Sequence, residues 1–532
     1  MSKIDELMRQ GLQFHQAGRL PEAQALYEKV LDKQPSHAAA NHLMGVALLQ
    51  RGDAAGAVTR LKRAVHVRGN DPEYLGNLGT ALNAAGRPAE AVEVFNKALK
   101  LQPANAGILN NRGMALRAVH RHDEGIASHR AACLARPDEP TFHSNLGKAL
   151  SEMGDWRGAE TAYRRALELA GNFPNALTGL TNTLLAQQRK DEAVATAADF
   201  ADRFPQEPEY NRALGIAHWT SGNPSAAAAA YRAALAADPR DVESHRMLGS
   251  IVVRSSEDAE VRAVESLLAE PALPDDRRAQ LEFTLGTAFD DIGDEGRASQ
   301  HFARGNALIR KLRPFSIEKA LAELSDLQRQ FADVEVPPLE SPTGPIFIVG
   351  LPRSGKTTLE GMLARHPAFF PAGELQVVGN LSGGVHQHGK EAAKALGDRY
   401  LAMAKALAPG LRILDTQPEN FRFVGILRQA IPSARILHVT RDPDAHARAL
   451  PRKLYLQSGN DYTNDPADLS AYLAAYHELM SFWRQRFPDY VLDVNVTAGS
   501  VDMLTVLQFL GVPWDPATAA PYASEPRVPA GS

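Results

Sequence analysis

Small, large apolar and helix-ending residues recur with a period of 34 along residues 11–239. Each period has a turn-like dipeptide, a small residue five positions later and, in most periods, a large residue four positions after that. A small residue lets two helices approach closely, and a proline cannot continue a helix. The pattern therefore predicts helical hairpins around seven turns: Gly18-Arg19, Gly52-Asp53, Gly86-Arg87, His120-Arg121, Gly154-Asp155, Gln188-Arg189 and Gly222-Asn223.

The pattern weakens after residue 240. Gly249 begins an eighth unit whose turn is replaced by Ser255-Ser256, and Leu285-Gly286 resumes the pattern three residues out of phase. This period, with these residue positions, resembles the tetratricopeptide repeat family. The resemblance implies an all-α solenoid of about eight or nine repeats over residues 1–310, with a concave groove that binds a protein or peptide. A spacer or a dimerisation scaffold is the alternative.

A different pattern begins after the repeats. Residues 317–331 have apolar positions at helical spacing and predict one more helix, capped by Ser316. Residues 333–345 are rich in proline and glycine, so we expect residues 311–343 to connect two domains. From residue 344 to 532, short apolar runs alternate with helical stretches, and strands are predicted at 345–350, 436–439 and 490–494. Such alternation is typical of an α/β domain with a parallel sheet.

Composition excludes several classes of protein. The 58 basic and 62 acidic residues give a net charge of −4, too small to hold the chain on nucleic acid or an anionic membrane. A single cysteine, Cys133, excludes an internal disulfide and a cysteine-based zinc site. The first residues have no signal-peptide core, and no run approaches the ~20 apolar residues of a membrane span. These features predict a soluble cytoplasmic protein.

One loop carries the strongest chemical signal. The predicted strand 345–350 runs into Gly350-Leu-Pro-Arg-Ser-Gly-Lys-Thr357, and a helix follows. Backbone N–H groups and a helix N-terminus at such a loop favour phosphate. Taken alone, the string fits G-x-x-x-x-G-K-[ST], which predicts a P-loop nucleotide triphosphatase or phosphotransferase that uses Lys356. That chemistry needs an acid for Mg²⁺, and Asp415 stands at a suitable place.

Four short motifs favour another chemistry. Pro352-Arg353-Ser354-Gly355 with Thr357 resembles the 5′-phosphosulfate loop of sulfotransferases, and Arg441-Asp442-Pro443 after an apolar strand resembles their 3′-phosphate motif. Gly373-Glu374 is similar to the catalytic-base motif of tyrosylprotein sulfotransferases and their bacterial relatives. Pro513-Trp514 matches the end of that domain. Bacterial proteins with tetratricopeptide repeats ahead of a sulfotransferase domain share this order, so the resemblance covers almost the whole chain.

The resemblance implies a reaction and a role for each residue. The donor is 3′-phosphoadenosine 5′-phosphosulfate, and its sulfuryl group moves to an acceptor hydroxyl, with protein tyrosine, a carbohydrate and a small metabolite all open. Glu374 is the expected base, Arg441 the partner of the 3′-phosphate, and Lys356 and Arg353 the cations at the transferred group. The loop residues expected to hold the donor are Pro352, Arg353, Ser354, Gly355, Lys356, Thr357 and Thr358. No metal is expected, and Trp514 is assigned to the core.

Several positions depart from the family pattern. Lys356 stands where relatives have threonine, Ala449 replaces a serine, Ala445 an aspartate, and Thr416 a lysine. Only a short segment with Arg527 follows the last motif, where relatives have a basic segment that closes over the nucleotide. Each replacement removes a group that would bind the charged donor, worth about 1.5–3 kcal/mol. An inactive sulfotransferase-like domain that acts as a binding scaffold is therefore a further alternative. His386 and His388 are interpreted as loop residues rather than metal ligands.

Overall fold

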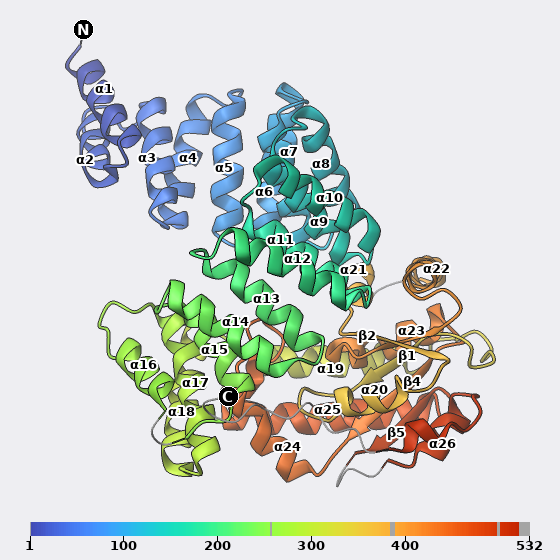
Figure 1. Cartoon of the computed structure of the whole chain (residues 1–532). Helices are drawn as coiled ribbons and strands as arrows, with labels where there is room; N and C mark the ends of the chain where they lie inside the picture. Colours follow the sequence, from blue (N-terminus) through green and yellow to red (C-terminus); the bar gives the residue numbers. More distant parts are fainter. Residues whose placement is uncertain (1, 256–257, 383–388, 497–500, 521–532) are drawn as a thin grey trace. The chain divides into compact units, whose positions relative to one another are not determined.

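The computed structural model describes residues 2–255, 258–382, 389–496 and 501–520 of the 532-residue chain (Figure 1). The fold is mostly helical over the first 300 residues and continues into an α/β domain with a parallel sheet. By internal packing the chain divides into two compact units, Met1–Met153 with Arg157–Ala176, and Gly154–Trp156 with Leu177–Ser532. The last repeats and the α/β domain thus belong to one unit.

Successive helices of the repeat region form antiparallel pairs, as the period predicts. In chain order they are α1 (Lys3–Gln16), α2 (Leu20–Leu31), α3 (Ala38–Gln50), α4 (Ala54–Val67), α5 (Pro72–Ala84), α6 (Pro88–Leu101), α7 (Ala106–Ala118), α8 (His122–Ala135), α9 (Pro140–Glu152), α10 (Trp156–Ala170), α11 (Pro174–Ala186), α12 (Lys190–Arg203), α13 (Pro208–Thr220), α14 (Pro224–Ala237), α15 (Val242–Ile251), α16 (Ala259–Leu268), α17 (Asp275–Ile292) and α18 (Glu295–Leu312).

All seven predicted turns lie between paired helices, and the first residue of each has a positive φ, from 58° to 87°. Two of these residues, His120 and Gln188, are not glycines and adopt the left-handed region at some cost. The turn position therefore fixes the conformation, and glycine is the residue that fills it most easily.

A glycine in the first helix of most pairs packs on a large side chain sixteen residues later in the second. A Cβ on Gly79 would lie 2.5 Å from a ring carbon of Phe95, and one on Gly11 would lie 2.6 Å from a ring carbon of Tyr27. Phe95 and Tyr27 are fully buried. The period therefore places these large residues inside their own hairpin, as well as next to the following one.

The helix α19 (Ile317–Phe331) follows the repeats and is capped by the Ser316 hydroxyl, which accepts from the Lys319 N–H, as predicted. Its apolar face, with Leu324, Leu327 and Phe331, is buried in the core on one side of the sheet. This helix is consequently part of the α/β layering.

The sheet has five parallel strands in the order β2-β3-β1-β4-β5. The strands are β1 (Ile346–Val349), β2 (Phe369–Gly373), β3 (Arg412–Asp415), β4 (Arg435–Thr440) and β5 (Val491–Asn495). The helices around it are α20 (Lys356–Leu363), α21 (Val377–Ser382), α22 (Lys390–Leu407), α23 (Val424–Ala430), α24 (Pro443–Ala449), α25 (Pro466–Arg486) and α26 (Met503–Phe509), with 3₁₀ turns η1 (Pro418–Phe423), η2 (Leu450–Arg452), η3 (Asp461–Asn464) and η5 (Pro516–Ala519).

The predicted strands β1, β4 and β5 are confirmed, whereas β2 and β3 were not predicted. The signal of β2 is weak because it is an edge strand that contains Pro371, which only an edge tolerates. Alternate residues of β1 enter the two cores, since Ile346 and Ile348 pack with α20 and α26, and Phe347 and Val349 pack with α19, α22 and α25. In the described part of the chain, no helix is long and apolar enough to span a membrane.

We predict that Gly79→Ala lowers the stability of the protein by about 1–3 kcal/mol, since the added methyl group has to displace the buried Phe95 ring. Urea unfolding followed by circular dichroism measures the change. The matched control is Gly107→Ala in α7, where the new Cβ has only a van der Waals neighbour at 3.6 Å and helix propensity favours alanine. Equal effects of the two substitutions would contradict the role assigned to this packing.

Candidate functional site

The carboxyl ends of the parallel strands meet at one edge of the sheet, and most of the predicted site residues follow them. The loop 350–355 follows β1, Glu374 follows β2, Thr416 follows β3 and Arg441 follows β4. In open α/β sheets, ligands bind at this edge. The topology thus brings together residues that lie up to 91 positions apart in the sequence, from Gly350 to Arg441.

The loop itself has the backbone of an anion site. Gly355 has a φ of 105° and precedes the first residue of α20, while Arg353 has a φ of 65° although it is not glycine. Positive-φ residues among right-handed neighbours can turn successive N–H groups toward a common point, an arrangement that favours an anion. Strain of the Arg353 type is concentrated at functional sites. A side chain at Gly355 would collide with Val496, since its Cβ would lie 2.4 Å from a methyl carbon.

Two side chains hold the loop from outside. The Arg441 Nη1 donates to the Arg353 carbonyl at 2.9 Å, and the His446 Nε2 lies 2.7 Å from the Pro352 carbonyl oxygen. Both come from the segment that follows β4. Asp442 caps α24 by accepting from the Ala445 N–H at 2.7 Å. The 3′-phosphate motif of the resemblance is therefore also a structural support of the phosphate loop.

Polar groups inside the loop are suited to an anion. The Ser354 hydroxyl is buried and has no hydrogen-bond partner among the described residues. The Lys356 ammonium is also buried and donates to the carbonyls of Gly350 at 3.1 Å and Leu351 at 3.3 Å. Burial lowers the pKa of Lys356 to about 8, and the nearby carboxylate of Glu374 opposes that shift. Among the other loop residues, Pro352 is buried, Thr357 is exposed and Thr358 is half-buried.

Glu374 is exposed. Two hydrogen bonds fix the backbone of Gly373, the residue before it. The Gly373 N–H donates to Glu360 at 2.9 Å, and its carbonyl accepts from the Thr416 N–H, also at 2.9 Å. Glu374 is close enough to raise the pKa values of Lys356 and Lys453 against the effect of burial. The predicted base thus lies within electrostatic reach of two cations.

Sequence reasoning missed Glu360 and Lys453. Burial raises the pKa of Glu360 to about 7, and the neighbouring carboxylates of Asp415 and Glu374 add to the shift. Glu360 stands four residues after Lys356 on α20, and this spacing places both side chains on the same face of the helix. The sequence shows this spacing, so Glu360 could have been predicted. Lys453 lies beyond η2 and has no signal in the sequence, because only the tertiary fold brings it to the loop.

Two expectations need correction. Asp415 is not exposed to a Mg²⁺ ion in this structure, because it is fully buried and accepts from the Tyr400 hydroxyl at 2.7 Å and the Gln417 N–H at 3.0 Å. The phosphotransferase alternative therefore lacks its candidate metal ligand and rests on the loop motif with Lys356. Trp514 is 48% exposed and so does not belong to the core, since it lies beyond α26, the last helix that packs on the sheet. Ser256, His386, His388 and Arg527 lie outside the described residues.

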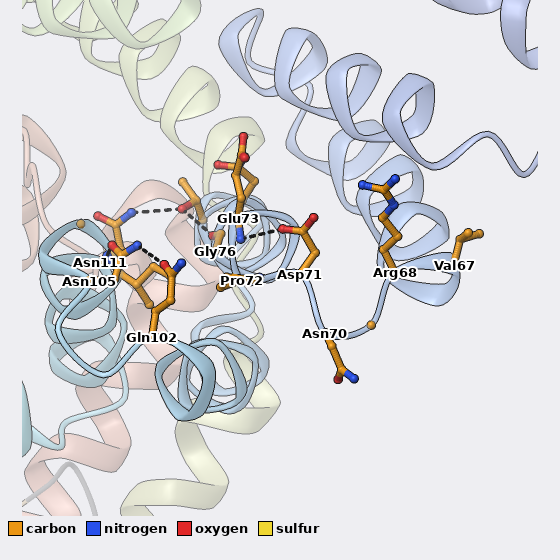
Figure 2. Close-up of a pocket in the computed structure, with 15 residues that line it drawn as sticks. Val67, Arg68, Asn70, Asp71, Pro72, Glu73, Gly76, Gln102, Asn105 and Asn111 are labelled. Atoms are coloured by element: carbon orange, nitrogen blue, oxygen red, sulfur yellow. Dashed lines mark hydrogen bonds between the residues drawn. The ribbon is translucent and has the colours of Figure 1, made fainter.

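A separate cavity of ≈ 990 Å³ lies on the repeats of the first unit (Figure 2). Its lining comes from the 67–72 connection and from α5 and α7, where the Asn111 amide donates to the Thr80 hydroxyl at 3.1 Å. Asp71 caps α5 by accepting from the Glu73 N–H at 3.0 Å. The lining is rich in side-chain amides, groups that suit the polar backbone of a bound chain.

Comparison with known proteins distinguishes the repeats from the α/β domain. The model of the sulfotransferase family matches residues 345–516, and two tetratricopeptide-repeat models match residues 14–78 with 150–215 and residues 76–140 with 212–277. Residues 345–516 are a sulfotransferase-family domain behind tetratricopeptide repeats. The recognition of both families from the sequence is confirmed.

Individual relatives are distant. An uncharacterized protein of Aquifex aeolicus (strain VF5) is 24% identical over a match of 287 positions, and the match covers 48% of this chain and 38% of that protein. The chain thus matches well under half of the length of this relative. Among solved structures, the thermophilic repeat protein TTC0263 of Thermus thermophilus is 23% identical, with a TM-score of 0.30, over 34% of this chain and 99% of its own. PilF of Pseudomonas aeruginosa is 18% identical, with a TM-score of 0.34, over 39% and 94%.

We predict that Glu360→Gln gains stability relative to the wild type as the pH rises from 5 to 8. Burial raises the pKa of Glu360 in the folded state to about 7, whereas in the unfolded chain the group ionises at a lower pH. The wild type therefore loses stability as the pH rises toward about 7, and the glutamine variant does not. Glutamine still accepts from the Gly373 N–H. Urea midpoints at both pH values measure the effect, and Glu391→Gln, at an exposed position on α22, is the control. If the difference in urea midpoint between Glu360→Gln and the wild type does not change with pH, Glu360 is not the buried carboxyl group that we infer.

Proposed function

We propose that the protein transfers a sulfuryl group from 3′-phosphoadenosine 5′-phosphosulfate to an acceptor hydroxyl, and that its repeats dock the acceptor or a partner protein. The observation that carries the proposal is the anion site of the sulfotransferase-family domain, where the phosphate loop, Arg441 and Glu374 share one edge of the sheet. The unpartnered Ser354 hydroxyl supports it, because a phosphate or sulfate oxygen is a natural partner for such a group.

The roles of the residues follow from their positions. In the proposed reaction, the donor's phosphosulfate group lies on the loop of Pro352, Arg353, Ser354, Gly355, Thr357 and Thr358. Arg441 has guanidinium nitrogens left for the 3′-phosphate, since among the described residues only its Nη1 donates a hydrogen bond, to the Arg353 carbonyl. The donor supplies the sulfuryl group. The bond from sulfur to the acceptor oxygen forms as the bond from sulfur to the phosphate oxygen breaks, and Glu374 takes the acceptor proton.

Lys356 is proposed to leave its loop carbonyls for the phosphate oxygen that carries the developing charge. Such a switch is favourable on energetic grounds, because hydrogen bonds to neutral carbonyls compensate a buried ammonium less than an anion does. In this role the Lys356 ammonium takes the place of the serine and the lysine that Ala449 and Thr416 replace. An inactive binding scaffold is the second candidate, and those same two positions favour it.

Binding of adenosine 3′,5′-bisphosphate tests the donor site without knowledge of the acceptor. We expect calorimetry to show micromolar affinity for the wild type, at least a tenfold loss in Arg441→Gln, and no comparable affinity for ATP with Mg²⁺. Arg399→Gln, on an exposed face of α22, is the control for a general loss of positive charge. Tight binding of ATP with Mg²⁺ alone would instead restore the phosphotransferase hypothesis.

We further predict that this affinity falls as the pH rises from 7 to 9. Lys356 has a pKa of about 8, so its ammonium is increasingly deprotonated across this interval, and an anion binds the charged form better. The loss reaches several-fold at pH 9. In Lys356→Gln the affinity is lower at pH 7 and no longer depends on pH over this range. An identical pH profile in the variant would show that Lys356 does not meet the ligand.

A further inference from the structure

The last repeats hold the segment of the sulfotransferase-family domain that follows α24. The Arg452 guanidinium forms ion pairs with Asp290 and Glu295, both at 2.7 Å. The Asn306 amide donates to the Pro451 carbonyl at 2.9 Å, and Arg313 donates to the Tyr455 carbonyl at 2.8 Å. Hydrogen bonds and ion pairs from the last repeats thus lie on both sides of Lys453 and fix its backbone.

A cavity of ≈ 750 Å³ lies between these two parts of the second unit. Helices α13, α15, α17 and α18 line it on one side, where Trp219, Arg246 and Phe283 lie. The sulfotransferase-family domain lines it with Arg353, Arg448 and Lys453, and also with Ala445 and Ala449, two of the positions that depart from the family pattern. Its volume lies in the range of small-ligand sites. Arg353 belongs to the phosphate loop, so the cavity reaches the site where transfer is proposed.

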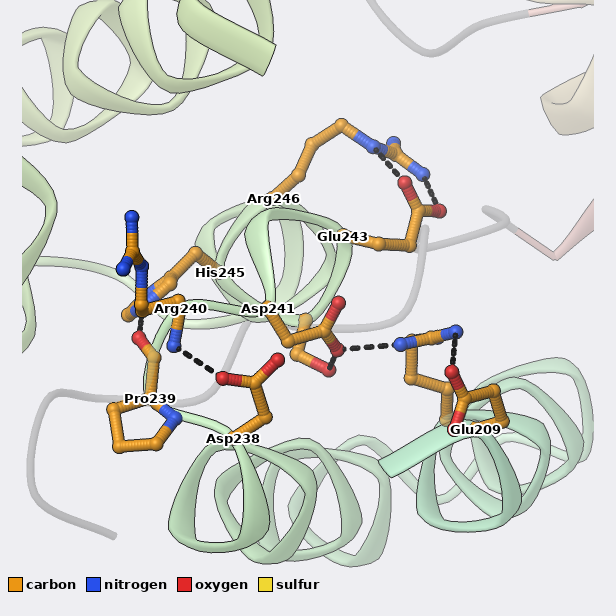
Figure 3. Close-up of polar contacts among 10 residues, drawn as sticks. Glu209, Asp238, Pro239, Arg240, Asp241, Glu243, His245 and Arg246 are labelled. Carbon is orange, nitrogen blue, oxygen red and sulfur yellow. Dashed lines mark hydrogen bonds and ion pairs between the residues drawn. The ribbon is translucent and has the colours of Figure 1, made fainter. Parts of the chain in front are cut away.

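Most charges of the cavity are already compensated. Asp290 and Glu295 pair with Arg452, and Asp291 accepts from the Arg254 N–H at 3.2 Å. Arg246 pairs with Glu243 on its own helix (Figure 3). The acidic residues of the lining therefore offer little attraction to a cation.

Three cations of the lining are not compensated in this way. The side chains of Arg353, Arg448 and Lys453 have no ion-pair partner among the residues that the structure describes. Arg353 is assigned to the donor by the proposed function, which leaves Arg448 and Lys453. Lys453 lies near enough to Glu374 for that carboxylate to oppose the lowering of its pKa by burial. Lys453, on the wall of the cavity, therefore lies within electrostatic reach of the proposed base.

We propose that this cavity is the acceptor site and that it takes a hydroxyl compound carrying a negative charge, which Arg448 and Lys453 bind. The proposal rests on the proposed function and adds the charge of the acceptor and the part played by the repeats. The repeat helices α13, α15, α17 and α18 then form one wall of the acceptor site, and Trp219 supplies an apolar face for the body of the acceptor.

The test uses the full chain saturated with adenosine 3′,5′-bisphosphate, so that anionic probes cannot enter the donor site. Two probe pairs differ in charge, 4-hydroxyphenylacetate against tyramine, and glucuronate against glucosamine. We expect the anion of at least one pair to bind at least tenfold more tightly than its cationic partner. The pair that responds distinguishes a phenolic from a sugar acceptor.

Variants then locate the site. Arg448→Gln is expected to weaken the anionic probe about tenfold or more and to leave bisphosphate affinity unchanged. Arg304→Gln is the matched control, since Arg304 is exposed on α18 and lines neither side of the cavity. Loss of bisphosphate binding in Arg448→Gln would assign the cavity to the donor and overturn the proposal.

Other results also decide. If the wild type binds the bisphosphate but no probe, the cavity is not the acceptor site. If it binds both members of each pair equally, the acceptor is not selected by a negative charge. An anionic probe that binds equally to the wild type and to Arg448→Gln would place the acceptor elsewhere. If the bisphosphate itself does not bind, the proposed function fails first, and this outcome is distinct from the others.

Discussion

The candidate site depends on one constraint, the parallel direction of all five strands. Parallel pairing places every strand's carboxyl end at the same edge, so the loop after β1, the turn after β2 and the arginine after β4 become neighbours. The central strand β1 is buried on both faces and joins the two halves of the sheet, because it pairs with β3 on one side and with β4 on the other. A change in the register of β1 would move the phosphate loop away from both Arg441 and Glu374.

The repeats and the central strands were predictable because their signals are local or periodic. A turn that needs a positive φ selects glycine, and a buried strand selects Ile346-Phe347-Ile348-Val349. The phosphate loop was predictable for the same reason, since its backbone conformation and its motif lie within one short segment. The edge strand β2 was missed because Pro371 and a single-sided environment weaken the apolar pattern.

The rest of the site depends on tertiary interactions that the sequence does not show. Lys453 reaches the loop because Arg452, one residue earlier, is paired with the repeats. Asp415 is buried, and one of its hydrogen-bond donors is Tyr400, fifteen residues away on another element. The exposure of Trp514 depends on how the chain leaves the sheet after α26. Such features are set by the packing of whole layers, and no short motif records them.

The clamp between Arg452 and the two acids of α17 and α18 has a consequence for the ancestry of this architecture. Repeat arrays commonly lengthen or shorten by whole units, because each unit contacts only its neighbours. Here the final unit also contacts a segment of the sulfotransferase-family domain, so its removal would leave a guanidinium without counter-charges. We therefore expect gain and loss of repeats to be tolerated at the amino-terminal end of the array, and the terminal unit to change together with the domain that it contacts.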